Sequence, residues 1–345
     1  MTRSDKPLIR ALQGEVTSQV PCWFMRQAGR YLEEYRAVRA SVPDFLSLCY
    51  HPEKAAEVTL QPIRRYGMDG AILFSDILVI PDALGVDVRF VAGEGPRLGK
   101  VTSLAQVDAL NVNRTLTHLV PVTQTITRVK PELPEHVAFL GFAGAPWTVA
   151  CYMLQGKGGG FDEAIALAKT QPELVDAVIE KVTEATILYL GMQVRAGVDA
   201  LQIFDSWAGL VPDDMFERLV IAPNQKIAAA MKKDHPHIPL IGFAKSIGRR
   251  LKRYAEITDF NGLGVSMDMA LRDALTDKQP HQALQGNLDP ELLASDLPKA
   301  LDATKQILDT MRAHPFIFNL GHGMVPHCPP ENLAALMDVI RNYAR

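Results

Sequence analysis

Short, continuously apolar runs recur along this chain of 345 residues, and segments long enough to form helices separate them. The runs lie at residues 71–74, 138–142, 200–204, 240–243, 263–265, 283–286 and 316–318. Strands that are buried on both faces have this continuous pattern, which is typical of parallel sheets covered by helices. The alternation therefore predicts an α/β protein with parallel strands joined by right-handed crossovers.

Helical patterns fill the intervals at residues 52–66, 172–196 and 330–343, each of which begins with a proline. No linker, repeat or charge run divides the chain, so we predict a single domain over residues 1–345 with a (β/α)8 TIM-type barrel fold. Only seven strands are evident, and we expect the eighth near residues 20–24 or in an irregular form. A doubly wound open sheet is the alternative, although no G-x-G-x-x-G motif follows the first strand.

The composition is that of a globular protein and argues against two classes of function, nucleic-acid binding and membrane association. Apolar residues make up 48% of the chain, and 36 Lys and Arg against 39 Asp and Glu give a net charge of −3. This mild acidity argues against a general nucleic-acid or anionic-membrane surface. The most apolar stretch, residues 71–88, contains Asp76 and Asp82 and is a poor membrane span. Widely spaced cysteines without a C-x-x-C motif indicate thiols in a reducing compartment, so we expect a cytoplasmic protein. They are Cys22, Cys49, Cys151 and Cys328.

Polar residues stand where several of the apolar runs end, and a parallel barrel gathers these strand ends at one mouth. They are Asp76, Asp205, Ser206, Lys245, Asp268, Asn287 and His322. Asp76 either caps the next element or faces the mouth. Tyr152 lies one or two helical turns beyond a strand end, so its hydroxyl either reaches the mouth or is a buried structural group. The glycine-rich stretch at 156–160 lacks the P-loop pattern and is better interpreted as a surface loop.

Two arginines stand four residues apart in the segment PCWFMRQAGR at 21–30. If the segment forms a helical turn, Arg26 and Arg30 share one face. Guanidinium groups bind carboxylates through paired hydrogen bonds, and the backbone at Ala28 and Gly29 can add N–H donors. The segment is therefore either a cradle for an anionic substrate or a solvated basic turn.

The densest group of histidine and cysteine residues lies at 319–330. A zinc site needs at least three ligands at workable spacing, and the adjacent His327 and Cys328 form an awkward pair. We therefore expect no metal here. His322 follows a strand and is instead a candidate hydrogen-bonding or titrating group.

Together these segments resemble the uroporphyrinogen decarboxylase family over about residues 7–344. The motifs are PCWFMRQAGR (21–30), FSDIL (74–78), GFAGAPWT (141–148), FDSWAG (204–209), QGNLDP (285–290) and NLGHG (319–323). The resemblance implies a (β/α)8 barrel with a deep cleft at the carboxyl ends of its strands, and a homodimer. It also implies a reaction without any cofactor, in which the four acetate side chains of uroporphyrinogen III become methyl groups. The products are coproporphyrinogen III and four CO2, on the route to haem and other tetrapyrroles.

The resemblance also implies roles for particular residues. Asp76 would be the central acid, and Arg26 is the usual nominee for the proton donor. The substrate loop would consist of Arg26, Gln27, Ala28, Gly29 and Arg30, with Tyr152, Ser206 and His322 lining the cleft. One alternative is a zinc-dependent methyltransferase of related fold, which needs a His-x-Cys motif that residues 243–245 lack. The other is a tetrapyrrole-binding protein without turnover, which product formation would distinguish from an enzyme.

Overall fold

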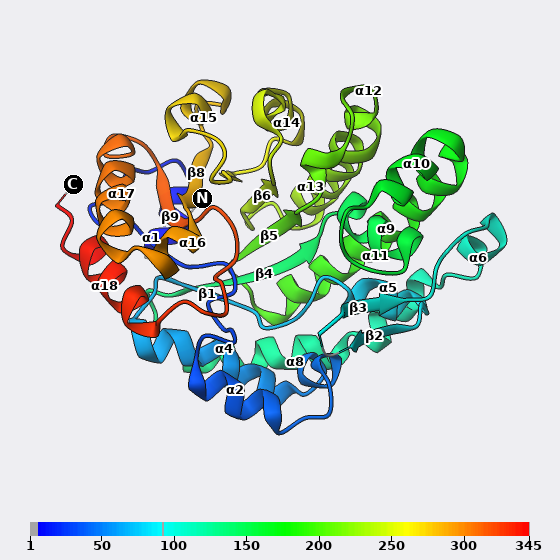
Figure 1. The fold of residues 1–345 in the computed structure, drawn as a ribbon, viewed down its shortest axis with the longest axis horizontal. Helices are drawn as coiled ribbons and strands as arrows, with labels where there is room; N and C mark the ends of the chain where they lie inside the picture. Colours follow the sequence, from blue (N-terminus) through cyan, green and yellow to red (C-terminus); the bar gives the residue numbers. More distant parts are fainter. Residues whose placement is uncertain (1–5, 92, 345) are drawn as a thin grey trace.

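A curled parallel sheet forms the centre of the protein, surrounded by helices (Figure 1). The computed structural model describes residues 6–91 and 93–344. Within them the sheet has seven strands in the order β1-β4-β5-β6-β7-β8-β9, and every pairing is parallel. The strands are β1 (Gly70–Ile72), β4 (Ala138–Gly144), β5 (Ala200–Asp205), β6 (Leu240–Ala244), β7 (Gly262–Gly264), β8 (Ala283–Leu288) and β9 (Phe316–Leu320). Each strand overlaps one of the apolar runs, so the predicted parallel α/β fold is confirmed.

Helices connect the strands and cover the outer side of the sheet (Figure 1). Their bounds are α1 (Pro7–Leu12), α2 (Glu33–Ala40), α3 (Phe45–Cys49), α4 (Pro52–Tyr66), α5 (Val79–Leu84), α6 (Leu104–Asp108), α7 (Thr115–His118), α8 (Val120–Val129), α9 (Pro146–Gln155), α10 (Asp162–Thr170), α11 (Pro172–Ala196), α12 (Asp213–Phe216), α13 (Ala222–Asp234), α14 (Leu251–Thr258), α15 (Leu271–Asp277), α16 (Pro290–Ser295), α17 (Leu297–Thr310) and α18 (Pro330–Arg341). The predicted helices at 52–66 and 172–196 match α4 and α11 at both ends, and α18 ends two residues earlier than predicted. None of the described helices combines the length and the apolar character that crossing a bilayer demands.

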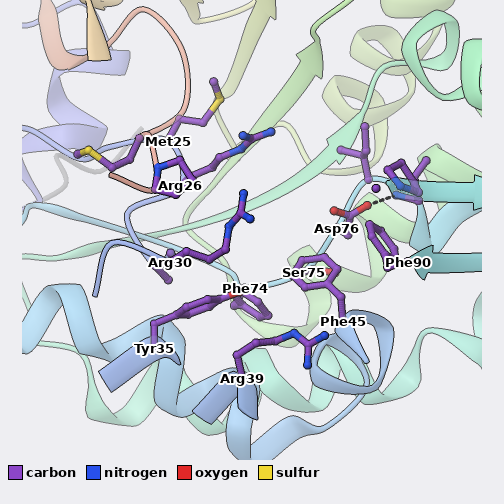
Figure 2. A pocket seen from close by; sticks show the side chains of 18 of the residues that line it. Met25, Arg26, Arg30, Tyr35, Arg39, Phe45, Phe74, Ser75, Asp76 and Phe90 are labelled. Carbon is purple, nitrogen blue, oxygen red and sulfur yellow. Dashed lines mark hydrogen bonds between the residues drawn. The ribbon is translucent and has the colours of Figure 1, made fainter. Parts of the chain in front are cut away.

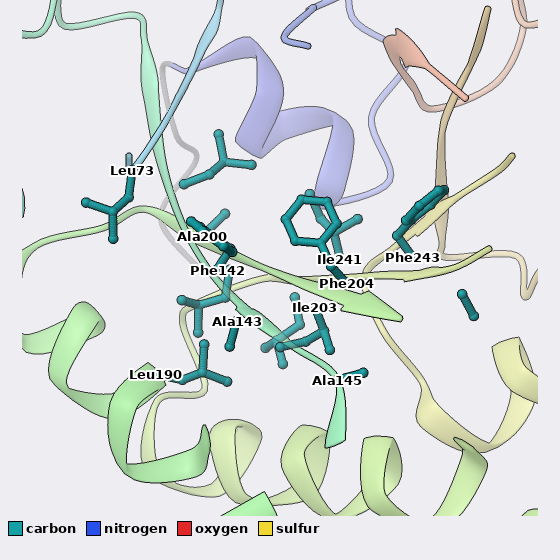
Figure 3. Packing of buried hydrophobic residues seen from close by; sticks show 14 of the residues in the cluster. Leu73, Phe142, Ala143, Ala145, Leu190, Ala200, Ile203, Phe204, Ile241 and Phe243 are labelled. Carbon is teal, nitrogen blue, oxygen red and sulfur yellow. The ribbon is translucent and has the colours of Figure 1, made fainter. Parts of the chain in front are cut away.

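Apolar side chains from neighbouring strands pack together inside the curled sheet (Figure 3). The rings of Phe142 and Phe204 meet edge to face at 5.6 Å between centroids, and those of Phe204 and Phe243 at 6.3 Å. A buried polar side chain connects the sheet to a helix on its outer side. Gln193 of α11 accepts a hydrogen bond from the Phe142 backbone N–H and donates one to its carbonyl, both at 2.8 Å. Because this amide satisfies both backbone groups of Phe142, it attaches α11 directly to β4.

The segment expected to supply an eighth strand, residues 20–24, forms no strand. It makes a single isolated parallel bridge, between Cys22 and Phe318 of β9. The backbone N–H of Phe318 donates to the carbonyl of Pro21 at 2.8 Å, and the N–H of Asp69 donates to the carbonyl of Cys22 at 2.9 Å. The described sheet therefore has seven strands rather than the predicted eight, because proline and these irregular contacts replace a regular ladder.

Asp69 joins this early segment to the end of the chain. Its carboxylate accepts a hydrogen bond from the Cys22 backbone N–H at 2.8 Å and from Arg341 of α18 at 3.1 Å. Asp69 is only 5% exposed, so both contacts replace water that the carboxylate has lost.

A hairpin of two antiparallel strands stands apart from the main sheet. It consists of β2 (Val88–Val91) and β3 (Gly95–Leu98). The sequence patterns did not indicate it, because each strand has only four residues and β3 begins with Gly95 and Pro96, which are unfavourable in strands. Residues of this hairpin form part of the wall of the cleft described next.

Candidate active site

A cleft of about 970 Å³ opens at the carboxyl ends of the strands. The residues that the resemblance assigns to the site all line it, although they come from distant parts of the chain. They are Arg26, Gln27, Ala28, Gly29, Arg30, Asp76, Tyr152, Ser206 and His322. Four other polar residues at strand ends are not among the lining residues. They are Asp205, Lys245, Asp268 and Asn287.

The two arginines of the substrate loop do not lie on a helical turn, contrary to the geometry considered from their spacing. Residues 25–32 form successive turns, and Arg26 has a φ of +62°, in the left-handed region. Both side chains nevertheless extend toward the cleft (Figure 2). Within the described residues neither Arg26 nor Arg30 forms an ion pair with a carboxylate, so both guanidinium groups are available to an anionic ligand.

Gln27 lines the cleft, yet its side chain is buried and serves the loop itself. The side-chain oxygen of Gln27 accepts from the Phe24 backbone N–H at 3.0 Å, and its NH2 donates to the Gly70 carbonyl at 3.1 Å. Tyr31 donates to the Gln27 carbonyl at 2.8 Å. These bonds fix the loop against β1. The loop and β1 therefore already use both the oxygen and the NH2 of the Gln27 amide.

The segment after β9 holds the other side of the loop. The backbone N–H of Met25 donates to the Asn319 side chain at 3.1 Å, and Met25 accepts from the Met324 N–H at 2.8 Å. The Arg26 side chain crosses Gly323 so closely that a Cβ at position 323 would lie 2.5 Å from its Cδ. The absence of a side chain at 323 therefore permits the position of the Arg26 guanidinium.

Asp76 stands just beyond β1, and Figure 2 shows it across the cleft from the arginines. One carboxylate oxygen accepts a hydrogen bond from the Leu78 backbone N–H at 2.8 Å. Burial raises the pKa of Asp76 to about 6, although the Leu78 bond and the charge of Arg26 oppose the rise. The carboxylate is therefore ionised at neutral pH but sits in a poorly solvated place.

Tyr152, Ser206 and His322 come from α9, from the turn after β5 and from the turn after β9. Burial raises the pKa of Tyr152, so its hydroxyl stays protonated at neutral pH. Burial, with help from the nearby positive charges of Lys245 and Arg26, lowers the pKa of His322 to about 4. His322 is therefore neutral near pH 7 and can both donate and accept hydrogen bonds.

Sequence reasoning missed one side of the cleft, which α2, α3 and the hairpin supply. Arg39 adds a third guanidinium from α2 (Figure 2). Aromatic rings continue this wall, with Tyr35 and Phe74 at 5.8 Å between centroids and Phe45 and Phe90 at 4.9 Å. The sequence contained one signal for this wall: Tyr35 and Arg39 are four residues apart in an amphipathic helix and therefore lie on the same face.

Among the described residues no three His, Cys, Asp or Glu side chains come together in a way that could hold a metal ion. His327 and Cys328 do not act jointly, because His327 pairs with Glu291 on the surface while Cys328 is buried. All four cysteines are buried and free.

Comparison with known proteins assigns the chain to a family. The family model described as uroporphyrinogen decarboxylase (URO-D) matches residues 3–343. The chain belongs to the uroporphyrinogen decarboxylase family. Uroporphyrinogen decarboxylases of similar sequence occur in Granulibacter bethesdensis, at 48% identity over 98% of this chain and 99% of that protein, and in Rhodospirillum rubrum, at 46% over 99% and 98%. The resemblance drawn from the sequence motifs is thereby confirmed.

A methyltransferase from Methanosarcina mazei has a similar structure, with a TM-score of 0.79 over 98% of both chains, at 20% sequence identity. A putative vitamin-B12-independent methionine synthase from Listeria monocytogenes is more distant, at a TM-score of 0.57 and 12% identity. At such identities the likeness extends to the fold alone. This chain thus has the same overall fold as these two proteins.

Proposed function

We propose that this chain decarboxylates the four acetate side chains of uroporphyrinogen III to methyl groups, giving coproporphyrinogen III and four CO2 in haem and tetrapyrrole biosynthesis. The chain is a carboxy-lyase, because it belongs to the uroporphyrinogen decarboxylase family over residues 3–343. The observation that supports the substrate best is that unpaired arginines lie across the cleft from the half-buried carboxylate of Asp76.

The charges in the cleft suit this substrate although the chain as a whole is negative. Uroporphyrinogen has eight carboxylates, and Arg26, Arg30 and Arg39 offer guanidinium groups from one side of the cleft. The aromatic wall of Phe45, Phe74 and Phe90 suits the flat apolar surface of pyrrole rings. Holding the macrocycle in one orientation alone lowers the barrier by several kcal/mol, up to about 7–11 in well-aligned model reactions.

Asp76 is the residue that we propose for the chemical step. An acetate on a pyrrole loses CO2 slowly, because the carbanion left behind has no stabilisation. Protonation of the neighbouring ring carbon creates a cationic electron sink, and CO2 then leaves to give an exocyclic methylene group. Protonation of this methylene carbon and loss of the proton from the ring carbon restore the pyrrole with a methyl group, so each acetate takes up one proton and releases one CO2. The positive charge extends to the ring nitrogen, where a preorganised carboxylate such as Asp76 stabilises it by charge and by accepting the pyrrole N–H.

Arg26 is the second residue of the proposed catalytic pair. A guanidinium is a very weak acid, so solvent water or a substrate carboxyl can deliver the proton while Arg26 orients the substrate. Gln27, Ala28, Gly29 and Arg30 complete the substrate loop. We propose that Tyr152, Ser206 and His322 hydrogen-bond the substrate; each of them lines the same cleft.

The proposal extends to the whole molecule. Residues 21–23 act as an irregular eighth strand that closes a (β/α)8 barrel, an interpretation supported by the hydrogen bonds of this segment to β9 and to Asp69 beside β1. The chain forms one domain, which is consistent with a hydrophobic core that extends from Leu8 to Ile340. It acts in the cytoplasm and needs no cofactor or metal. It assembles as a homodimer, and sedimentation analysis of the purified protein would test this oligomeric state.

The test is incubation of purified, chelator-treated protein with uroporphyrinogen III under anaerobic conditions, followed by separation of the oxidised products by carboxyl number. We expect products with seven to four carboxyl groups. Activity that appears only after addition of zinc and a methyl donor would replace the proposal with methyl transfer. Tight binding without carboxyl loss would leave a tetrapyrrole-binding protein without turnover.

A further inference from the structure

Trp207 contacts a hydroxyl group that faces the cleft. It follows Ser206 in the turn after β5, and its indole N–H donates a hydrogen bond to the Tyr152 phenolic oxygen at 3.3 Å. A phenol has one hydrogen to donate and lone pairs that accept, whereas an indole N–H only donates. Tyr152 therefore accepts from Trp207, and its own hydrogen is left for another acceptor. In the described part of the chain the Tyr152 hydroxyl has no second hydrogen-bond partner.

The other tryptophans of the chain direct their N–H groups elsewhere. Trp23 donates to the buried side chain of Gln285 at 2.8 Å, and Trp147 donates to the Trp207 carbonyl at 3.2 Å. Both of these rings are fully buried, and their bonds join parts of the core. Trp207 is half-buried, and its bond ends on a residue that lines the cleft.

A third aromatic ring limits the movement of this pair. Phe161 packs against Tyr152 at 5.0 Å and against Trp207 at 4.8 Å between centroids. Phe161 is fully buried although its φ of +56° lies in the left-handed region, which is unfavourable for a bulky residue. The unfavourable backbone conformation of Phe161 thus places its buried ring in contact with both Tyr152 and Trp207.

The backbone of Trp207 is fixed by the helix from which Tyr152 comes. Its N–H donates to the Thr148 hydroxyl at 3.1 Å, and that hydroxyl donates to the buried Asp205 carboxylate at 2.6 Å. Thr148 and Tyr152 are four residues apart on α9 and so lie on one face of the helix. The turn after β5 and α9 are therefore held in one register, which keeps the indole N–H aimed at the phenol.

We propose that Trp207 is a positioning residue of the cleft, whose N–H commits the Tyr152 hydroxyl hydrogen to a carboxylate of the bound substrate. Without this donor the phenol can rotate and point its hydrogen away from the cleft. Burial raises the pKa of Tyr152 by more than the hydrogen bond from Trp207 lowers it, which keeps the hydroxyl protonated and available as a donor. The inference rests on the proposed function, since it takes the cleft to bind a polycarboxylate.

The first test is a double-mutant cycle with Trp207→Phe and Tyr152→Phe. Phe at 207 retains an aromatic ring next to Phe161 but removes the N–H. We expect kcat/KM for uroporphyrinogen III to fall about tenfold in Trp207→Phe, the loss expected for one hydrogen bond at about 1.4 kcal/mol. In the Tyr152→Phe background the same substitution should change kcat/KM less than about twofold, because the hydroxyl that it orients is gone.

A rescue variant separates the N–H from the shape of the ring. The imidazole of Trp207→His overlays the five-membered ring of indole, and its Nε2–H takes the place of the indole N–H. We expect kcat/KM of Trp207→His to be at least about threefold higher than that of Trp207→Phe. Thermal unfolding of all the variants shows whether each one folds.

The same cycle is repeated as binding of uroporphyrin III, the oxidised macrocycle that keeps all eight carboxylates, by calorimetric titration. If the wild-type protein does not decarboxylate uroporphyrinogen, the proposed function fails and the binding cycle still decides the role of Trp207. Equal losses from Trp207→Phe with and without the Tyr152 hydroxyl would overturn the inference, as would a folded Trp207→Phe protein with wild-type binding and turnover.

Discussion

At the scale of single residues, the proposed reaction depends most on the negative charge of Asp76. Asp76→Asn keeps an oxygen that can accept a pyrrole N–H but removes the negative charge. We expect kcat to fall by about 10²–10³, the range found when a preorganised stabilising group is lost, while the Kd for uroporphyrin III changes less than about threefold. Asp87→Asn is the control, because Asp87 is exposed and pairs with the nearby, exposed Arg89.

The raised pKa of Asp76 also predicts a pH dependence. Since the ionised form is the active one, kcat/KM should decline below a pKa of about 6 and level off above it. The residual activity of Asp76→Asn should lack this decline. A decline that persists unchanged in Asp76→Asn would instead belong to the carboxyl groups of the substrate and would contradict the assignment.

Gly323 permits the position of Arg26, so Gly323→Ala should displace that guanidinium without changing its charge. A Cβ at 323 would lie 2.5 Å from the Cδ of Arg26, which must shift to relieve the overlap. We expect kcat/KM to fall by about 10²-fold, as small misplacements of positioning groups do, with little change in melting temperature. Gly99→Ala is the control, since Gly99 lies outside the left-handed region and a Cβ there would meet no atom closer than 3.9 Å. A fully active Gly323→Ala protein would show that Arg26 tolerates a different position.

At the scale of elements, the attachment of α11 to β4 depends on one side chain. Gln193→Leu removes both hydrogen bonds to the Phe142 backbone and leaves its buried N–H and carbonyl unpaired. The expected loss is about 3 kcal/mol in the free energy of unfolding, measured by urea denaturation. Turnover per folded molecule should stay close to that of the wild type, and a variant of unchanged stability would refute this role of the amide.

The strands and the long helices could be predicted because burial on both faces leaves continuous apolar runs that proline and glycine delimit. The positions of Asp76, Ser206 and His322 followed, since parallel strands end at one edge of a sheet. Arg39, Phe45 and Phe90 could not be placed in the same way. They come from α2, α3 and the hairpin, whose packing over the cleft depends on contacts between distant residues rather than on a local pattern. The structural role of Gln27 likewise depends on Gly70, far away in the sequence.

At the scale of the whole molecule, Asp69 connects the first and last parts of the fold. Asp69→Ala would leave the Cys22 N–H and the Arg341 guanidinium without their shared carboxylate. Breaking a buried pair of this kind costs about 3–5 kcal/mol, so the midpoint of urea unfolding should fall markedly. Asp87→Ala breaks an exposed pair and should change the free energy of unfolding by less than about 0.5 kcal/mol. Equal effects of the two substitutions would show that Asp69 does not secure this junction.

The central claim is that the cleft decarboxylates acetate groups by protonation and without a cofactor. The most direct test is anaerobic turnover of uroporphyrinogen III in D2O by chelator-treated protein, with mass spectrometry of the oxidised product. We predict the loss of four CO2 and the gain of one deuterium in each of the four new methyl groups. Loss of CO2 without deuterium in the methyl groups, or only after a metal or cofactor is added, would contradict the account.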